Sequence, residues 1–256
     1  MFFVPHLKNK RGGTYDVLPF PPPCTNEGHD AYNGIFTGIS VEICNANDIR
    51  ALYTNGFYGK GSQSRSVPNV VYKNPSEIDL EERETLSLGS EESFFLAYYL
   101  RVLKIFDFDA KEITWEDFMK SALKVNGNFV ESVAAYVYLK SKGWVVKSGL
   151  KFAGNYLIYS KGPRFFHASF VVIVNIPSNT QHLEPKKIKG LQRIAETSDK
   201  DVLLLDITKP KNFKMQTPQD IAMLNVTESI IKRFNYTSYV QTQRNSISKM
   251  LKSKKN

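Results

Sequence analysis

The stretch that most constrains the fold of this chain is an apolar hairpin pattern in residues 144–174. Two segments rich in aromatic and β-branched residues, Asn155–Ser160 and Phe165–Val174, predict β-strands. The sequence Lys161-Gly162-Pro163-Arg164 between them is typical of a turn. Every second residue of the second segment is apolar, so that face is expected in the core. Its members are Phe166, Ala168, Phe170, Val172 and Val174.

Two titratable residues of this hairpin, Tyr159 and His167, lie at equal distances from Pro163 along the chain. A symmetric register would make them cross-strand neighbours on one face, with Cβ atoms about 5 Å apart. A slip of one residue would separate them, because it moves every side chain to the other face. Taken alone, such a pair is more often a satisfied core contact than a catalytic one.

A third candidate, Lys200, lies where a helix is expected to lead into a strand. The periodicity of residues 185–198 predicts a helix, and the apolar run in residues 201–207 predicts a buried strand. A junction of this kind can present a side chain to the edge of a sheet. The apolar stripe of the expected helix consists of Ile188, Leu191, Ile194 and Ala195.

Three short motifs give these residues a common context. Tyr159 in GNYLIY, His167 in FFHASF and Lys200 in ETSDKDVLLL resemble the tRNA-intron endonuclease family. SKGWVVKSGLKF and the SKGP turn resemble its eukaryotic catalytic subunit that cuts the 5′ splice site. The resemblance implies an α/β (α+β) chain, with an N-terminal mixed helical domain followed by a restriction-endonuclease-like catalytic domain with a mixed sheet. It also implies that Tyr159, His167 and Lys200 form a catalytic triad.

The chemistry of RNA cleavage suits these residue types. The 2′-hydroxyl beside the scissile phosphate is the nucleophile, so a base must take its proton and an acid must protonate the leaving 5′-oxygen. Tyr159 is expected as the base, His167 as the acid and Lys200 as the cation that stabilises the phosphate charge. The products would be a 2′,3′-cyclic phosphate and a 5′-hydroxyl, with no metal and no cofactor. Tyrosine has a pKa of about 10, and a nearby Lys200 would favour tyrosinate.

Two further residues are expected to bind RNA by the same resemblance. The family uses an arginine at the place of Arg193, and an aromatic near the C-terminal strand, to sandwich a base. Phe234 occupies the aromatic place, where eukaryotic relatives commonly have tryptophan, and phenylalanine is the weaker cation–π partner. The alternative is a surface arginine and a core phenylalanine.

Charge and cysteine content narrow the class of protein. The net charge of +9 suits an anionic partner, of which nucleic acid is the usual one. Cys24 and Cys44 lack metal-ligand spacing and suit a reducing compartment. No apolar run reaches the roughly 20 residues of a membrane span, and the N-terminus lacks a signal-peptide pattern.

Composition and pattern divide the chain into four parts. We expect an extended basic and proline-rich arm in 1–35, a mixed α/β domain in 36–143, the catalytic domain in 144–239 and a basic tail in 240–256. The second part carries a glycine-rich stretch, Gly56–Ser62, which lacks the Walker pattern, and its resemblance to the N-terminal domain of the same family implies that it is structural. Its other expected elements are a strand in 38–44 and helices in 48–55, 91–103, 114–125 and 129–142. The expected N-caps of the first three helices are, in order, Asn45 or Asn47, Ser90 and Thr114.

Three other hypotheses about the function of this chain stay open. A metal-dependent nuclease on the same fold would need converging carboxylates, for which Asp201 and Asp206 are candidates beside Lys209. A noncatalytic assembly subunit, or the sister subunit that cuts the 3′ site, would share the fold. By resemblance the partners are precursor tRNA, a second catalytic subunit and two structural subunits in a heterotetramer, joined through a strand in 226–234. The expected location is the nucleus, or alternatively the cytoplasmic face of mitochondria.

Overall fold

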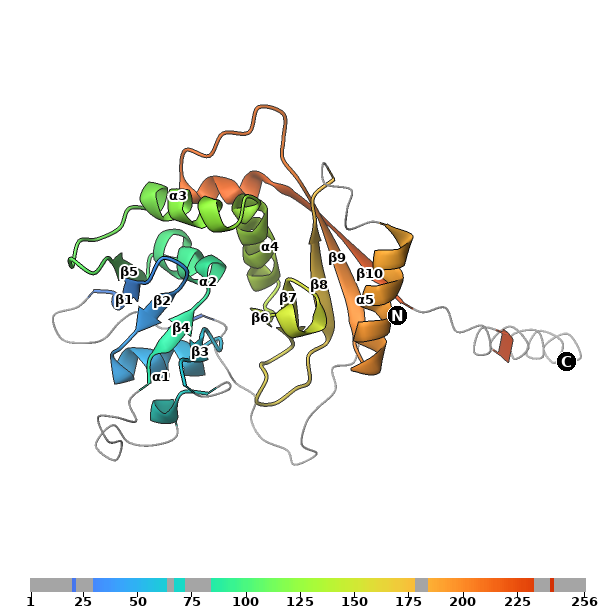
Figure 1. Ribbon diagram of the computed structural model, residues 1–256, viewed down its shortest axis with the longest axis horizontal. Helices are drawn as coiled ribbons and strands as arrows, with labels where there is room; N and C mark the ends of the chain where they lie inside the picture. The colour runs from blue at the N-terminus through green and yellow to red at the C-terminus, as the bar shows by residue number, and fades with distance from the viewer. Residues whose placement is uncertain are drawn as a thin grey trace, which may run out of the picture.

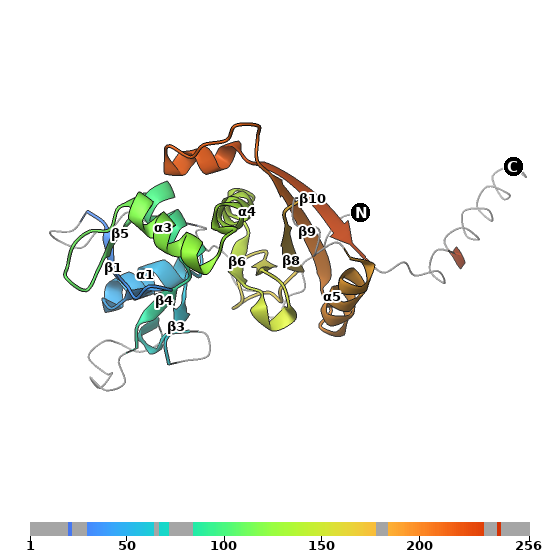
Figure 2. The same ribbon diagram turned by 45° about the horizontal axis from the view of Figure 1, so that its top comes forward.

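The computed structural model of the chain describes residues 20–21, 30–63, 67–71, 84–177, 184–232 and 240–241. These residues form two five-stranded sheets with helix α4 (Phe129–Ser141) between them, as both views show (Figure 1, Figure 2). α4 packs against two helices of the first half and against one face of the second sheet. The predicted α/β class and the mixed sheet of the C-terminal half are confirmed, and the sheet of the N-terminal half is mixed as well.

The first sheet belongs to the N-terminal half and has the strand order β3-β4-β2-β1-β5. β1 runs parallel to the edge strand β5, and the other neighbours are antiparallel. Its strands are β1 (Tyr32–Phe36), β2 (Val41–Ile43), β3 (Lys60–Gly61), β4 (Leu86–Leu88) and β5 (Leu103–Phe106). The helical elements of this half are α1 (Ala46–Thr54), η1 (Asn69–Val71), α2 (Ser90–Phe94), η4 (Phe95–Tyr99) and α3 (Trp115–Val125).

Side-chain caps explain where two of these helices begin. The Asn45 side chain accepts hydrogen bonds from the amides of Asn47 and Asp48 at the start of α1. The Thr114 side chain accepts from the amide of Asp117 at the start of α3, and both caps agree with the sequence prediction. Such caps satisfy amide groups that have no partner inside the helix.

Three local expectations for this half are wrong. The helix predicted in 91–103 is a short α-helix continued by a π-helical turn that ends at Tyr99, and Gly89 takes the N-cap position expected for Ser90. The last residue of the predicted helix, Leu103, instead begins β5, whose partner β1 is more than sixty residues earlier in the sequence. β1 itself begins at Tyr32, inside the stretch expected to be irregular.

The second sheet belongs to the C-terminal half and has the order β10-β9-β8-β7-β6, with β8 and β9 parallel. Its strands are β6 (Val145–Ser148), β7 (Tyr156–Tyr159), β8 (Phe170–Asn175), β9 (Asp201–Thr208) and β10 (Asn225–Ile231). Helix α5 (Pro185–Thr197) joins β8 to β9, and the short helices η5 (Leu150–Phe152) and η7 (Pro218–Met223) lie in connections. α5 agrees with the predicted helix, but Ile194 of its predicted apolar stripe is exposed.

Two cores cover the faces of the second sheet. The main core, which includes Phe170, Val172 and Val174, continues through α4 into the first half of the chain. The smaller α5-side core lies between the sheet and helix α5, and includes Leu157, Val171 and Ala195. Because buried apolar surface stabilises both faces, the inner strands β7 and β8 are apolar almost throughout, whereas the edge strand β10 is largely exposed. No helix in the described ranges is both long and apolar enough to cross a membrane.

Candidate active site

The loop between β7 and β8 carries His167 and breaks the regular pairing of the two strands. The ladder pairs Tyr156 with Val172 and Ile158 with Phe170, and then ends. The amide of Ser169 donates to the carbonyl of Ile158 at 2.8 Å, one residue out of step with that ladder. The predicted second strand therefore begins five residues late, and the expected direct pairing of Tyr159 with His167 is wrong.

The irregular backbone also changes which face residues before β8 occupy. Ala168 packs in the α5-side core with Val171, although it was expected beside Phe170 in the main core. An irregularity of this kind re-aims side chains, and such features are common next to active sites. His167, between the buried Phe166 and Ala168, is exposed and accessible to a ligand.

The sheet nevertheless gathers the three candidate residues at one end. Tyr159 is the last residue of β7, and β8 begins shortly after His167. β9 runs parallel to β8 with Asp201 opposite Phe170, so Lys200 lies immediately before the paired region. The end of β7 and the starts of β8 and β9 lie together toward the bottom of Figure 1. The candidate triad therefore lies at one end of three neighbouring strands of the second sheet.

Tyr159 is half-buried at the border of the two cores. Burial raises the pKa of its phenol, because a buried charge loses its hydration. The phenol is therefore protonated at neutral pH. This direction is opposite to the expectation that Lys200 favours tyrosinate.

Lys200 is held at the helix–strand junction by its backbone and its side chain. Its amide donates to the carbonyl of Ala195 at 2.9 Å, and its Nζ donates to the carbonyl of Ser198 at 2.6 Å. The same Nζ lies 4.8 Å from the ring centroid of Phe152, a cation–π contact. Burial lowers the pKa of Lys200, and the charge of Asp199 partly opposes this. The Phe152 contact has no local signal in the sequence, because η5 and the junction are far apart in the chain.

Ser169 is a second residue at this end of the sheet that the motifs did not single out. It is buried, and its hydroxyl has no hydrogen-bond partner among the residues that the structure describes. Buried polar groups of proteins are mostly hydrogen-bonded, so an unpartnered one beside candidate catalytic residues needs an explanation. In the run FFHASFVVIV, which is apolar apart from His167 and this serine, the hydroxyl is the only trace of it in the sequence.

The structure describes only part of the predicted base clamp, the pair Arg193 and Phe234 that is expected to sandwich an RNA base. Arg193 lies on α5 and is exposed, four residues before the helix ends, whereas Phe234 lies outside the described residues. The clamp therefore stays a prediction.

The carboxylates considered for a metal site do not converge. Asp201 and Asp206 are five residues apart on β9, so their side chains leave opposite faces of the sheet. Asp201 forms an ion pair with Lys232 at 2.7 Å, and Asp206 accepts a hydrogen bond from the Asn175 amide. Lys209 pairs with Glu131 of α4. Across the described ranges, no group of three or more His, Cys, Asp or Glu side chains could hold a metal ion.

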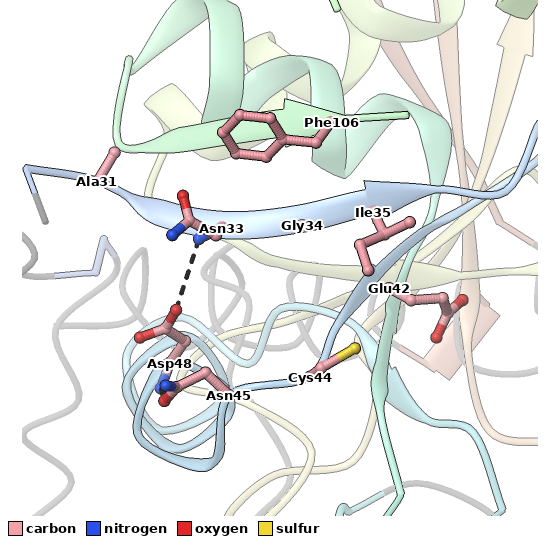
Figure 3. Close-up of a pocket in the computed structure, with 9 residues that line it drawn as sticks. All are labelled: Ala31, Asn33, Gly34, Ile35, Glu42, Cys44, Asn45, Asp48 and Phe106. Atoms are coloured by element: carbon pink, nitrogen blue, oxygen red, sulfur yellow. Dashed lines mark hydrogen bonds between the residues drawn. The ribbon is translucent and has the colours of Figure 1, made fainter. Parts of the chain in front are cut away.

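A hollow in the structure lies on the first sheet, away from these residues. It is lined by β1, β2, β5 and the start of α1, with Cys44 and Asp48 on its wall (Figure 3). The amide of Asn33 donates to Asp48 at 3.5 Å across it. The hollow contains none of the candidate triad, so it is a separate feature.

Comparison with known proteins covers both halves. Residues 32–119 match the family model "tRNA intron endonuclease, N-terminal domain", and residues 129–214 match "tRNA intron endonuclease, catalytic C-terminal domain". Tyr159, His167, Arg193 and Lys200 all lie within the second match, and Phe234 lies beyond it. Together the two matches span more than half of the chain.

Individual relatives agree. The chain is 34% identical over 174 residues to the tRNA-splicing endonuclease subunit Sen2 of Rattus norvegicus, covering 64% of this chain and 36% of the relative. It is 34% identical over 178 residues to the subunit of the same name from Gallus gallus. It is 29% identical over 171 residues to a tRNA-splicing endonuclease of Saccharolobus islandicus, covering 66% of this chain and 87% of the relative. The matched region spans about a third of the length of the Sen2 relatives. The chain belongs to the tRNA intron endonuclease family.

Proposed function

We propose that this chain is a catalytic subunit of a tRNA-splicing endonuclease and cleaves precursor tRNA at the 5′ splice site. The observation that carries the proposal is the placement of Tyr159, His167 and Lys200 at one end of one sheet, inside the matched catalytic domain. The similarity to relatives named as Sen2 subunits supports the substrate. The SKGP turn and the resemblance of the N-terminal half favour the 5′ cutter over its sister subunit.

The proposed reaction uses the RNA as its own nucleophile. The 2′-oxygen attacks the adjacent phosphorus while Tyr159 takes the 2′ proton, and the bond from phosphorus to the 5′-oxygen breaks. His167 gives its proton to the departing 5′-oxygen, and Lys200 balances the charge on the phosphate. The products are a 2′,3′-cyclic phosphate and a 5′-hydroxyl, and the reaction uses no metal. Because Tyr159 is protonated at neutral pH, only a small fraction of the protein carries the base form.

Partners follow from the shape of the second sheet and from the resemblance. β10 is an edge strand of seven residues with Ile230 54% exposed, and edge strands offer unpaired backbone groups to another chain. We infer a heterotetramer with a second catalytic subunit and two structural subunits, joined through β10. The proposed location is the nucleus, with the cytoplasmic face of mitochondria as the alternative, and imaging of the tagged chain distinguishes them.

The decisive experiment replaces the leaving group. In the assembled complex, His167→Ala should slow cutting at the 5′ splice site by about 10²–10⁴-fold and leave the 3′ cut unchanged. When sulfur replaces the 5′-bridging oxygen of the precursor, the thiolate leaving group departs without help from an acid. His167→Ala should therefore cut this precursor nearly as fast as wild type. If His167→Ala instead slows the 3′ cut, this chain is the sister subunit. If wild type and His167→Ala cut the normal precursor equally fast, His167 has no part in the mechanism.

End-group analysis of the same reactions tests the metal-dependent alternative. Cleavage should survive EDTA, apart from effects on tRNA folding, and should leave cyclic phosphate ends. Products with a 5′-phosphate, or activity restored only by added Mg²⁺, would support a metal-dependent nuclease.

A further inference from the structure

The glycine-rich stretch of the N-terminal half surrounds a buried aromatic residue in an unusual backbone conformation. Phe57 is 4% exposed and has a φ of 57°, in the left-handed region, between Gly56 at 96° and Gly59 at 66°. For a residue other than glycine, this backbone conformation costs on the order of 1 kcal/mol of folding free energy. Such conformations persist where surrounding contacts hold them. The contacts of the Phe57 ring therefore indicate what the loop is for.

The ring of Phe57 packs against the loop that carries His167. A Cβ atom at Gly162 would overlap the Phe57 ring carbons Cδ2, Cε2 and Cζ, so only glycine leaves room for the ring. The φ of Gly162 is 112°, which also favours glycine. On the same loop, the ring of Phe165 meets the Phe57 ring edge-on, with centroids 6.2 Å apart. Phe57 thus contacts the His167 loop at two points, five and two residues before the histidine.

The other side of this contact is fixed to the body of the protein. The ring of Tyr53, on α1, packs edge-on against Phe57 with centroids 5.6 Å apart. Lys147 on β6 donates from Nζ to the carbonyl of Gly59 at 2.5 Å, and the same Nζ lies 5.5 Å from the Tyr53 ring centroid. β6 pairs directly with β7, the strand that ends at Tyr159. The Phe57 loop is therefore anchored to the same sheet that holds the proposed base.

We propose that Phe57 is a positioning residue: through it, the N-terminal half holds the loop of His167 in place relative to Tyr159 and Lys200. The inference rests on the proposed function for its catalytic consequence. Residues 160–169 lie outside any strand of the sheet, so the ladder alone does not fix them. The Phe57 ring supplies contacts that the ladder lacks. A misplacement of about 1 Å caused by a change far from the reacting atoms can lower a rate by about 10²-fold.

The test compares Phe57→Ala and Phe57→Leu with Phe118→Leu in the full-length chain within its complex. Phe118 is fully buried and touches Phe94 and Phe129, on α2 and α4, so it matches the loss of core packing without the loop contact. We expect single-turnover cutting at the site of this subunit to fall about 10–100-fold in Phe57→Ala, with KM within about twofold of wild type. Phe57→Leu, which keeps part of the packing, should lose less, and Phe118→Leu should cut as wild type.

A second readout follows the loop without depending on RNA cleavage. Amide hydrogen exchange in residues 161–169 should become at least about tenfold faster in Phe57→Ala, while amides of β8 and β9 stay protected. Unchanged exchange in the loop, or equal loss of cutting in Phe118→Leu, would overturn the proposal. If Phe57→Ala fails to fold, the same comparison is made with Phe57→Leu. A wild-type complex that does not cut precursor tRNA would refute the proposed function, while the exchange measurement would still decide whether Phe57 orders the loop.

Discussion

The ammonium group of Lys209 lies 2.6 Å from the carboxylate of Glu131, and the two members of this pair differ sharply in exposure. The Glu131 side chain is 7% exposed and the Lys209 side chain is 45% exposed. Glu131 lies in the first turn of α4, and Lys209 directly follows β9. The pair therefore ties α4 to the second sheet, and it engages the lysine that a metal-dependent nuclease would have used.

This asymmetry predicts unequal effects of removing each partner. Lys209→Met should cost about 1–3 kcal/mol of unfolding free energy, because it leaves a buried carboxylate unpaired; the usual 3–5 kcal/mol is reduced by the exposure of the lysine. Glu131→Gln should cost less, because the lysine can return to water. The double variant should be more stable than Lys209→Met alone. Urea unfolding of the four proteins checks this, and simple additivity would contradict it.

Lys140 predicts a pH dependence of stability. It is 1% exposed on α4, and its Nζ lies 4.5 Å from the ring centroid of Tyr58 and 5.6 Å from that of Phe20. Burial lowers the pKa of Lys140 from 10.5 to about 8, with Glu92 opposing the shift and Lys147 adding to it. Between these values the unfolded chain holds the proton and the folded chain does not, so stability should rise with pH.

The expected gain from Lys140 is about 2 kcal/mol between pH 8 and 9.5, since one pKa unit corresponds to about 1.4 kcal/mol. Urea unfolding of wild type and Lys140→Met across this range measures the difference between them. The stability of Lys140→Met relative to wild type should decline as the pH rises. A constant difference would mean that Lys140 keeps an ordinary pKa in the folded protein.

Elements with strong local signals could be predicted from the sequence. α4 and the caps at Asn45 and Thr114 agree with expectation because periodicity and capping depend on neighbouring residues. β5 could not be predicted, because its four residues gain their strand conformation by pairing with β1, far away in the chain. The same limit explains the predicted helix that ends early at Tyr99.

The candidate site shows the same division. The motifs correctly place Tyr159 at the end of a strand and Lys200 at a helix–strand junction. The register around His167 could not be predicted, because Ser169 bonds one residue out of step with the ladder. The support from Phe57 is a contact between distant parts of the chain, for which the glycines at 56, 59 and 162 are the only local signs.

The raised pKa of Tyr159 predicts how cleavage depends on pH. With the sulfur-bridged precursor, which needs no acid, the cutting rate of wild type should rise about tenfold per pH unit from 6 to 9, because tyrosinate increases in that proportion. Tyr159→Phe should be slower, and its rate should no longer rise in this way. A flat profile for wild type would exclude tyrosinate as the base. An equal rise in Tyr159→Phe would assign that role to hydroxide from solvent.

Arg193 and Phe234 lead to a prediction that separates RNA binding from chemistry. By resemblance the clamp serves the active site of the other catalytic subunit, and the exposure of Arg193 on α5 is compatible with contact to a ligand. Arg193→Ala should therefore slow the 3′ cut more than the 5′ cut. Stacking of this kind is worth about 1–3 kcal/mol per base, which corresponds to roughly 5- to 150-fold in rate.

Substitutions at Phe234 complete the test of the clamp. Phe234→Trp should preserve or increase the 3′ cut, because tryptophan is the better cation–π partner, and Phe234→Leu should resemble Arg193→Ala. Gln192→Ala is the matched control, since Gln192 neighbours Arg193 on α5 and its side chain bonds Glu196 at 3.1 Å. The measurement is the separate rates of the two cuts on one precursor tRNA, in complexes checked for equal assembly. If Arg193→Ala leaves both rates unchanged, Arg193 is a solvated surface residue and the aromatic at 234 serves packing alone.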